Sequence, residues 1–393
     1  MNQLLLEAQE MYPELVEWRR TLHQHPEIGL DLPVTVTFVT DKLREMGYDP
    51  KPCAGGVVAL LEGASVGKTV LLRADMDALP MEEHSGLPFK STISGVAHTC
   101  GHDIHTAMLL GAAKLLMHNR SRISGNVKLM FQPGEEGYNG ALDMIKSGVL
   151  QWPEVDAALA LHTLVGGNHK VGSMWCAPDG PAKASSDTFE ITVFGKGAHG
   201  ATPEKGVDVI NALGHIHSAL QTINSREIAA REQVVLTVGA ISAGQKENIL
   251  PESGWMRGTI RTYSQELRDY IKQRIEAVSS KVAEALGARA EVVFSGGLPP
   301  TINDCTVASE MFSYVKELIG EENTGIIEPI TGADDFAEIT SRVPGVYMDL
   351  CFNDYASCPY SFHSPYIVFR EEIMPVGAAA YAYCAARWLA EHC

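Results

Sequence analysis

The sequence has few basic residues, and no segment of it is strongly basic. Lysine and arginine together number 31 against 48 aspartates and glutamates, which gives a formal net charge of -17. Proteins that bind nucleic acid or an anionic membrane present a basic face to it, so we expect neither as a partner. A soluble enzyme that acts on small molecules fits this charge better.

Paired cysteines and export signals are also missing. The eight cysteines lie far apart without a C-x-x-C pair, which argues against a zinc ribbon or a disulfide scaffold. Glu7, Glu10 and Glu14 interrupt the apolar residues of positions 1–20, so no segment there resembles a secretion signal. We therefore expect a cytoplasmic location. No internal repeats, heptads, H-E-x-x-H motif or P-loop occur either.

The length and the apolar runs predict an α/β protein of more than one domain. A chain of 393 residues with 45% hydrophobic residues exceeds what a single core normally supports. The buried strands that we expect are short apolar runs, at 57–61, 70–74, 127–131 and 157–161. Helical patterns separate the later runs, which predicts a mixed, largely parallel sheet flanked by helices.

A second domain is predicted inside the first. The Pro- and Gly-rich stretch 175–181 marks a boundary, and the order of elements after it is β-α-β-β-α-β, which is typical of a ferredoxin-like fold. The predicted elements are strand 187–194, helix 207–223, strands 234–241 and 254–262, helix 266–286 and strand 290–294. The expected organisation is a catalytic domain in two parts, 1–181 and 296–393, with an inserted domain over 182–295.

The stretch 97–105 contains several potential metal ligands within nine residues. It contains three imidazoles, the thiol of Cys100 and the carboxylate of Asp103, which are ligand types that zinc and similar divalent metals prefer. It lies between a predicted core strand and an apolar helix, where α/β enzymes place their active sites. We interpret it as half of a metal site.

Other polar residues follow predicted strands. Glu135 and Glu136 repel each other unless a cation holds them, and a metal would leave one as ligand and the other as base; a solvated turn is the alternative. Asp75 and Asp77 share a face of a strand end and either can orient a ligating histidine, or they belong to a surface loop. His162 ends a strand and is either a further ligand or a core residue.

Two motifs point to other chemistry. Gly195–Gly200 matches the dinucleotide pattern G-x-G-x-x-G, but the next strand lacks the terminal acid that would bind a ribose, so a glycine-rich turn that presents His199 is the better interpretation. Gly63–Gly67 matches a nucleophile elbow, but a strand follows it where a helix is required. We therefore expect a hairpin turn there.

Taken together, these motifs resemble the metallo-amidohydrolases, a family that includes hippurate hydrolases, bacterial N-acyl-amino-acid aminoacylases and plant auxin-conjugate hydrolases. That family lies within the superfamily of two-metal aminoacylases and carboxypeptidases. The matching motifs run in order along nearly the whole chain: Arg20–Glu27, Arg73–Pro80, Thr99–Thr106, Gln132–Gly137, Gly197–Pro203, Asn248–Pro251 and Phe362–Pro365. The resemblance implies a zinc-peptidase-like catalytic domain with an inserted dimerisation or lid domain.

The resemblance also implies roles for individual residues. The implied ligands of two divalent ions per subunit are Cys100, His102, Glu136, His162 and His363. Glu135 is implied as general base and Asp77 as support for a ligand. Zinc or manganese is expected, with cobalt and nickel as alternatives, because the thiolate of Cys100 leaves the identity of the metal open. Asp75 stands where the wider superfamily has a metal-binding histidine, and His102 where it has a bridging aspartate.

The inserted domain is implied to complete the active site of a homodimer. By resemblance, His199 reaches the active site of the partner subunit, and Asn248 and Arg261 match positions associated with a substrate carboxylate. The expected reaction is hydrolysis of an N-acyl amino acid. The alternatives are a dipeptidase, a carboxypeptidase or a deacetylase of a biosynthetic amino acid such as diaminopimelate. More remote are a nicotinamide-binding oxidoreductase and a non-catalytic protein on the same fold.

Overall fold

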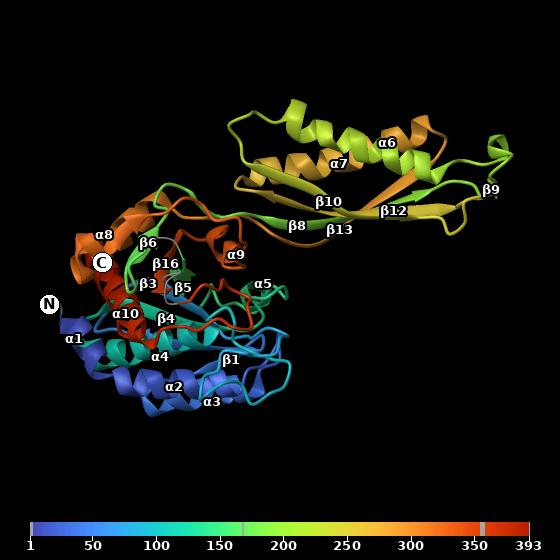
Figure 1. Ribbon diagram of the computed structural model, residues 1–393. Coiled ribbons are helices and arrows are strands. Elements are labelled where there is room, and N and C mark those ends of the chain that lie inside the picture. Colours follow the sequence, from blue (N-terminus) through green and yellow to red (C-terminus); the bar gives the residue numbers. More distant parts are fainter. Residues whose placement is uncertain (1–2, 167–168, 354–357, 393) are drawn as a thin grey trace. The chain divides into compact units, whose positions relative to one another are not determined.

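The computed structural model describes residues 3–166, 169–353 and 358–392. The chain forms two compact units (Figure 1). Unit 1 consists of Met1–Ala182, Ile302–Glu328 and Asp335–Cys393, and unit 2 of Lys183–Thr301 and Pro329–Asp334. The functional labels that we expect for them, a catalytic domain and a dimerisation or lid domain, remain predictions.

Unit 1 is built on an eight-stranded sheet in the order β1-β2-β4-β3-β5-β16-β6-β15. Its strands are β1 (Lys51–Cys53), β2 (Gly56–Glu62), β3 (Ser65–Asp75), β4 (Ser124–Gln132), β5 (Ala157–Val165), β6 (Met174–Cys176), β15 (Thr324–Ile326) and β16 (Gly345–Asn353). The central strands β4, β3, β5 and β16 run parallel, so the predicted mixed, largely parallel sheet is confirmed.

One turn was predicted wrongly. The residues after Glu62 do join β2 to β3, but these strands do not form a hairpin. β2 pairs antiparallel with β4, and β4 pairs parallel with β3 on its other side. The short connection therefore passes over the end of β4, which sequence reasoning did not foresee because consecutive strands are usually neighbours.

Helices cover both faces of this sheet (Figure 1). They are α1 (Gln3–Glu10), α2 (Tyr12–Gln24), α3 (Pro33–Glu45), α4 (His102–His118), α5 (Gly140–Lys146), α8 (Cys305–Ile319), α9 (Ala337–Thr340) and α10 (Met374–Glu391), with short turns η1 (Arg120–Arg122), η4 (Glu321–Asn323) and η5 (Glu371–Ile373). The helices α4, α10 and their neighbours form one core with Val70 and Leu72 of β3. Leu71 faces a second core with residues of α5 and α9.

Unit 2 has the predicted β-α-β-β-α-β order. Its elements are β8 (Ser186–Phe194), β9 (Ala198–His199), η2 (Pro203–Lys205), α6 (Val209–Thr222), η3 (Ile223–Glu227), β10 (Val234–Ala243), β11 (Ile249–Leu250), β12 (Ser253–Thr262), α7 (Gln265–Ala285) and β13 (Arg289–Leu298). The antiparallel sheet has the order β10-β12-β8-β13, and α6 and α7 pack on one of its faces. The chain passes from unit 1 to unit 2 at β7 (Pro181–Lys183), returns at β14 (Thr301–Ile302), and enters unit 2 once more over Pro329–Asp334. No helix in the described ranges is long and apolar enough to cross a membrane.

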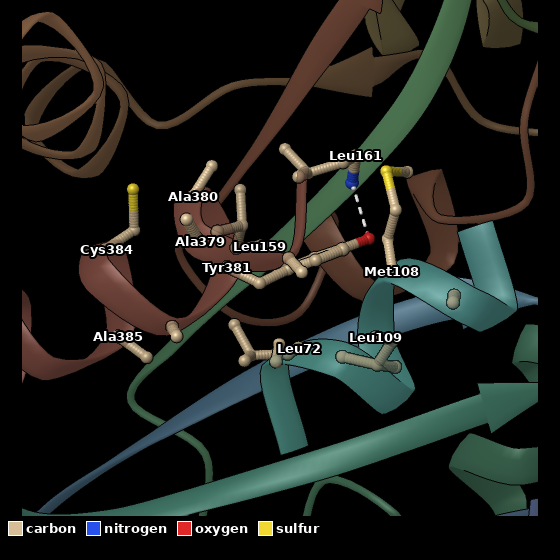
Figure 2. Close-up of a cluster of buried hydrophobic side chains, with 14 of the residues drawn as sticks. Leu72, Met108, Leu109, Leu159, Leu161, Ala379, Ala380, Tyr381, Cys384 and Ala385 are labelled. Carbon is tan, nitrogen blue, oxygen red and sulfur yellow. Dashed lines mark hydrogen bonds between the residues drawn. The ribbon is translucent and has the colours of Figure 1, made fainter. Parts of the chain in front are cut away.

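A buried tyrosine joins three elements of unit 1. Tyr381 of α10 is fully buried, and its hydroxyl donates to the carbonyl of Arg73 on β3 at 2.7 Å. The same hydroxyl accepts from the backbone N–H of Leu161 on β5 at 2.9 Å (Figure 2). Leu72, Leu159 and other apolar side chains surround it. The hydroxyl thus satisfies two backbone groups that have no access to water.

Replacement of Tyr381 by phenylalanine should destabilise unit 1. The ring remains, but the N–H of Leu161 and the carbonyl of Arg73 both lose this hydroxyl, which predicts a loss of about 1–3 kcal/mol in the free energy of unfolding. Tyr383→Phe is the matched control on the same helix, because the hydroxyl of Tyr383 binds Glu317 of α8 near the surface. This replacement should change stability by less than about 0.5 kcal/mol. Urea denaturation followed by circular dichroism measures both, and equal effects would contradict the role of the Tyr381 hydroxyl.

Candidate metal centre

The candidate site lies where parallel strands of unit 1 separate at their carboxyl ends. β3 and β5 pair from Val70 and Ala157 as far as Arg73 and Ala160. Beyond this point β3 stays paired with β4 as far as Asp75, whereas β5 continues beside β16. A crevice at the carboxyl ends of parallel strands is the usual place for an active site in α/β folds.

A glycine at the start of α4 allows the motif of residues 97–105 to enter this crevice. Gly101 has a φ of +94°, a left-handed conformation that suits glycine. A Cβ there would lie 2.8 Å from the Oγ1 of Thr163 and 2.8 Å from a ring carbon of Phe369. Only glycine therefore allows Cys100 and His102 to approach the end of β5.

The structure brings together all the residues of unit 1 that were predicted as ligands or base. Among these predicted residues, ligand atoms that lie within 4.8 Å of one another form three overlapping groups. The groups are Cys100, His102 and His162; Cys100, Glu136 and His363; and His102, Glu135 and Glu136. They combine one thiol, three imidazoles and two carboxylates from four separate segments of the chain.

His102 supplies an observation that tests whether a metal fits. Its Nδ1 donates to the carbonyl of Asp77 at 2.9 Å, so its Nε2 carries the lone pair. That Nε2 is buried and has no hydrogen-bond partner among the described residues. Buried nitrogens are rarely left unpaired, and a cation at this position would satisfy this one. The donor set therefore fits a divalent metal.

His162 is oriented in the same way. Its Nδ1 donates to the carbonyl of Thr163 at 2.7 Å, and its Nε2 lies 3.6 Å from the Sγ of Cys100. The ring packs edge-on against Phe362 and stacks on Tyr347. A hydrogen bond at the second nitrogen is how proteins fix the tautomer of a ligating histidine.

The carboxylate of Asp77 holds the acidic turn. β3 ends at Asp75, so Asp77 lies in the following loop and not on the strand face that we predicted. Its two oxygens accept from the backbone N–H groups of Glu135 and Glu136, each at 3.0 Å. One oxygen also lies 3.4 Å from the Nδ1 of His102. Asp77 therefore fixes both acids and one imidazole relative to each other.

Glu135 and Glu136 have different surroundings. Glu136 lies 3.1 Å from the Nε2 of His363, whereas an oxygen of Glu135 lies 4.0 Å from the Nε2 of His102. Glu135 is 9% exposed, which is enough for contact with water. Glu136 therefore lies among the candidate ligands, and Glu135 lies beside them.

His363 comes from a loop near the end of the chain. Its backbone N–H donates to the carbonyl of Thr99 at 3.0 Å, which joins this loop to the one that carries Cys100. Its φ is +62°, a conformation that is uncommon for residues other than glycine and that often occurs at functional sites.

The electrostatics of the cluster favour a cation. Burial raises the pKa of the Cys100 thiol. Burial also opposes ionisation of Glu136, but the pKa of Glu136 is lowered overall, chiefly by the hydrogen bond to His363. A divalent ion would stabilise both a thiolate and a carboxylate here, because the surroundings contain little water.

The other predicted residues lie in unit 2. His199 forms β9, which pairs with β11, and its exposed ring accepts the N–H of Ala201 at Nδ1. Asn248 is exposed and its carbonyl accepts from Gly200, while Arg261 is half-buried on β12 opposite Val235. The segment Gly195–Gly200 contains β9 and is not followed directly by a helix, since α6 begins only at Val209. The phosphate-binding geometry of a dinucleotide site is therefore not formed.

Sequence reasoning missed three residues that shape the site. His105 lies in the motif of residues 97–105, but we gave it no role; its spacing of three from His102 places both on one face of α4, which was the available signal. Thr163 acts partly through its backbone, and Tyr381 comes from the far end of the chain, so the sequence gives no sign of either.

The donors are the buried Cys100, His102 and His162, the half-buried Glu136 and the exposed His363. Thiol, imidazole and carboxylate donors beside a second carboxylate are typical of metal-dependent hydrolases, in which a metal activates water and the carboxylate moves its proton. Consistent with this class, a family model described as Peptidase family M20/M25/M40 matches residues 71–387. The chain belongs to this peptidase family.

Relatives of known name cover nearly the whole chain. Thermostable carboxypeptidase 1 of Saccharolobus solfataricus is 35% identical over 395 residues, which is 99% of this chain and 98% of the relative. The hippurate hydrolase of Campylobacter jejuni is 32% identical over 398 residues, 98% of this chain and 99% of the relative. The crystal structure of the Bacillus subtilis YXEP protein, described as a dinuclear metal binding peptidase from the M20 family, has a TM-score of 0.84 at 30% identity and covers 98% of this chain and 100% of that one.

These findings confirm several predictions. The resemblance to the metallo-amidohydrolases is confirmed, and so is a hydrolase that acts on the carbon–nitrogen bond of amides. The predicted α/β fold is confirmed as well. The dependence of this hydrolase family on metal is confirmed too. The identity of the metal, the role of each residue and the homodimer stay predictions.

Replacement of Asp77 by asparagine should weaken metal binding. The carboxylate of Asp77 accepts hydrogen bonds from two backbone N–H groups. Asparagine has one acceptor oxygen, so its NH2 group would face one of these two N–H groups. We expect a fall of about 10–100-fold in apparent affinity for divalent ions, measured by competition with a chelating dye. Asp304→Asn is the control, because Asp304 also accepts two backbone N–H groups, at the start of α8. An unchanged affinity in Asp77→Asn would contradict the role given to this carboxylate.

Proposed function

We propose that this protein hydrolyses N-acyl amino acids to a carboxylic acid and a free amino acid, with the help of two divalent metal ions. One observation carries the proposal: Asp77 holds Glu135 beside the Nε2 of His102, a buried nitrogen without a hydrogen-bond partner in the described chain. The hippurate hydrolase relative supports the substrate class, since hippurate is itself an N-acyl amino acid.

The proposed ligands are the candidate donors other than Glu135. They are Cys100, His102, Glu136, His162 and His363. Five ligands shared by two ions leave positions open for water and substrate, as a catalytic site requires. The relative described as a dinuclear metal binding peptidase supports the number of ions. Zinc or manganese is the proposed metal, with cobalt or nickel as alternatives.

When bound, the two ions lower the pKa of a water molecule and polarise the amide carbonyl. The carboxylate of Glu135 takes a proton from this water as its oxygen attacks the carbonyl carbon. Glu135 then gives the proton to the nitrogen as the carbon–nitrogen bond breaks. The hydrogen bonds that Asp77 accepts from the backbone N–H groups of the turn hold the carboxylate of Glu135 in position throughout.

Unit 2 is proposed to complete the site in a homodimer. His199 accepts a hydrogen bond at Nδ1, so its neutral ring carries the hydrogen on Nε2, where it can donate to negative charge on the carbonyl oxygen of the substrate. Asn248 and Arg261 are proposed to bind the substrate carboxylate. Arg261 is suited to this because its guanidinium can make two parallel hydrogen bonds.

A carboxypeptidase is the second candidate. It is favoured by the thermostable carboxypeptidase relative, which is similar over nearly its whole length. Both substrates have an amide beside a free carboxylate, so the two activities can share one mechanism. Comparison of N-acyl amino acids with dipeptides separates them, because the free amine of a dipeptide must be accommodated near the metals.

Removal of the metal should abolish hydrolysis, and its return should restore it. We expect chelator-treated protein to release no free amine from a panel of N-acyl amino acids, and protein reloaded with zinc or manganese to regain activity. Detection of the released amine measures this. Full activity in protein shown by elemental analysis to be metal-free would contradict the proposal.

Glu135→Gln should remove activity and keep the metals. Glutamine cannot accept the proton of the attacking water, so we expect kcat to fall by about 10²–10⁴-fold with the metal content unchanged. Glu317→Gln is the control, because Glu317 binds Tyr383 and Arg387 at the surface. Near-normal turnover by Glu135→Gln would rule out the general base.

A further inference from the structure

Two buried side chains bridge the gap that opens between β3 and β5. The hydroxyl of Tyr381 spans it first, from the carbonyl of Arg73 to the N–H of Leu161. Two residues further along each strand, the ring of His105 spans it from the carboxylate of Asp75 to the N–H of Thr163. Each bridge stands where a direct hydrogen bond between the strands would otherwise lie.

The geometry determines which nitrogen of His105 carries hydrogen. The backbone N–H of Thr163 can only donate, and it points at Nε2 from 2.9 Å, so Nε2 must accept. The hydrogen of the neutral ring is then on Nδ1, which lies 2.6 Å from an oxygen of Asp75. Burial lowers the pKa of His105, which agrees with a neutral ring.

Asp75 is itself fixed from the other side. Its second oxygen accepts from Arg73 at 2.7 Å, and both side chains are almost completely buried. Burial alone would raise the pKa of Asp75, but the positive charge of Arg73 and the neighbouring imidazoles hold it well below the usual range. The carboxylate is therefore ionised and its acceptor direction towards His105 is fixed.

Thr163 connects this arrangement to two candidate ligands. Its carbonyl accepts the Nδ1 hydrogen of His162 at 2.7 Å. Its hydroxyl donates to the carbonyl of Cys100 at 3.2 Å. The orientation of Thr163 therefore decides where the Nε2 of His162 points and where the backbone of Cys100 lies.

We propose that His105 and Asp75 are positioning residues for the metal centre, acting through Thr163 on His162 and Cys100. The inference rests on the proposed metal site. Asp75 and His105 also lie near His102 in a group whose spacing would suit a metal. However, hydrogen bonds already occupy both oxygens of Asp75 and both nitrogens of His105. They hold the ligands and do not bind the ions.

Two variants interrupt the connection at different points. In Asp75→Asn an amide cannot accept from both Arg73 and His105, so one donor faces another or His105 changes tautomer and loses the N–H of Thr163. In His105→Asn the shorter side chain can still donate to Asp75 but no longer accepts from Thr163. If the first variant fails to fold because a buried charge loses its partner, the second decides the question.

Thr106→Val is the matched control. Thr106 follows His105 on α4, is equally buried, and donates its hydroxyl to the backbone carbonyl of Asp75 at 2.9 Å. Its replacement removes a buried hydrogen bond at the same strand end without touching the carboxylate. It should lower the thermal midpoint and leave the metal site unchanged.

The experiment measures binding of Zn²⁺ and Co²⁺ to the metal-stripped full chain, and the thiolate-to-cobalt absorption band that reports the geometry of Cys100. We expect Asp75→Asn and His105→Asn to bind about 10–100-fold more weakly and to shift or weaken the band, and Thr106→Val to match the wild type in both. Wild-type affinity and spectrum in the folded variants, or an equal loss in Thr106→Val, would overturn the proposal. A wild-type chain that binds neither ion would instead refute the metal centre, and this inference with it.

Discussion

The site depends on the point at which β3 and β5 stop pairing. As far as Arg73 and Ala160 the two strands form an ordinary parallel ladder, and beyond it their backbones have unpaired polar groups in a buried place. Such groups must find partners, and Tyr381 and His105 supply them. The separation that creates a crevice for chemistry is therefore stabilised by the side chains that fill its base.

Hydrogen bonds to the main chain set the orientation of several candidate ligands. The imidazoles of His102 and His162 donate to carbonyls of Asp77 and Thr163, and the two acids of the turn are held by their own N–H groups. Backbone groups belong to strands and turns that a whole core keeps in place. The candidate ligands are thus pre-oriented by the fold, which reduces the reorganisation needed to bind an ion.

The sequence predicted the candidate centre well because its residues stand in dense motifs at the ends of apolar runs. Glu135 and Glu136 follow the core strand β4, His162 lies near the carboxyl end of β5, and Cys100 and His102 stand at the start of the apolar helix α4. Parallel strands bring their carboxyl ends to one edge of the sheet. Contacts that depend on tertiary packing could not be predicted. Three examples depend on neighbours far away in sequence. They are the hydrogen bonds of Tyr381 to β3 and β5, the left-handed backbone of His363, and the connection that passes from β2 over β4 to β3.

The order of elements in the sheet has a consequence for folding during synthesis. β16 lies between β5 and β6, and Tyr381 packs against β3 and β5, yet both are made after all of β8 to β13. A ribosome therefore releases Cys100, His102 and His162 long before the strand and helix that complete their surroundings. Unit 2 is contiguous apart from a short segment, and its contiguous part is made before β16 and α10, so it can fold first. While only the first half of the chain has been made, its thiol and its unpaired sheet edge are exposed. The chain is then most vulnerable to aggregation and oxidation.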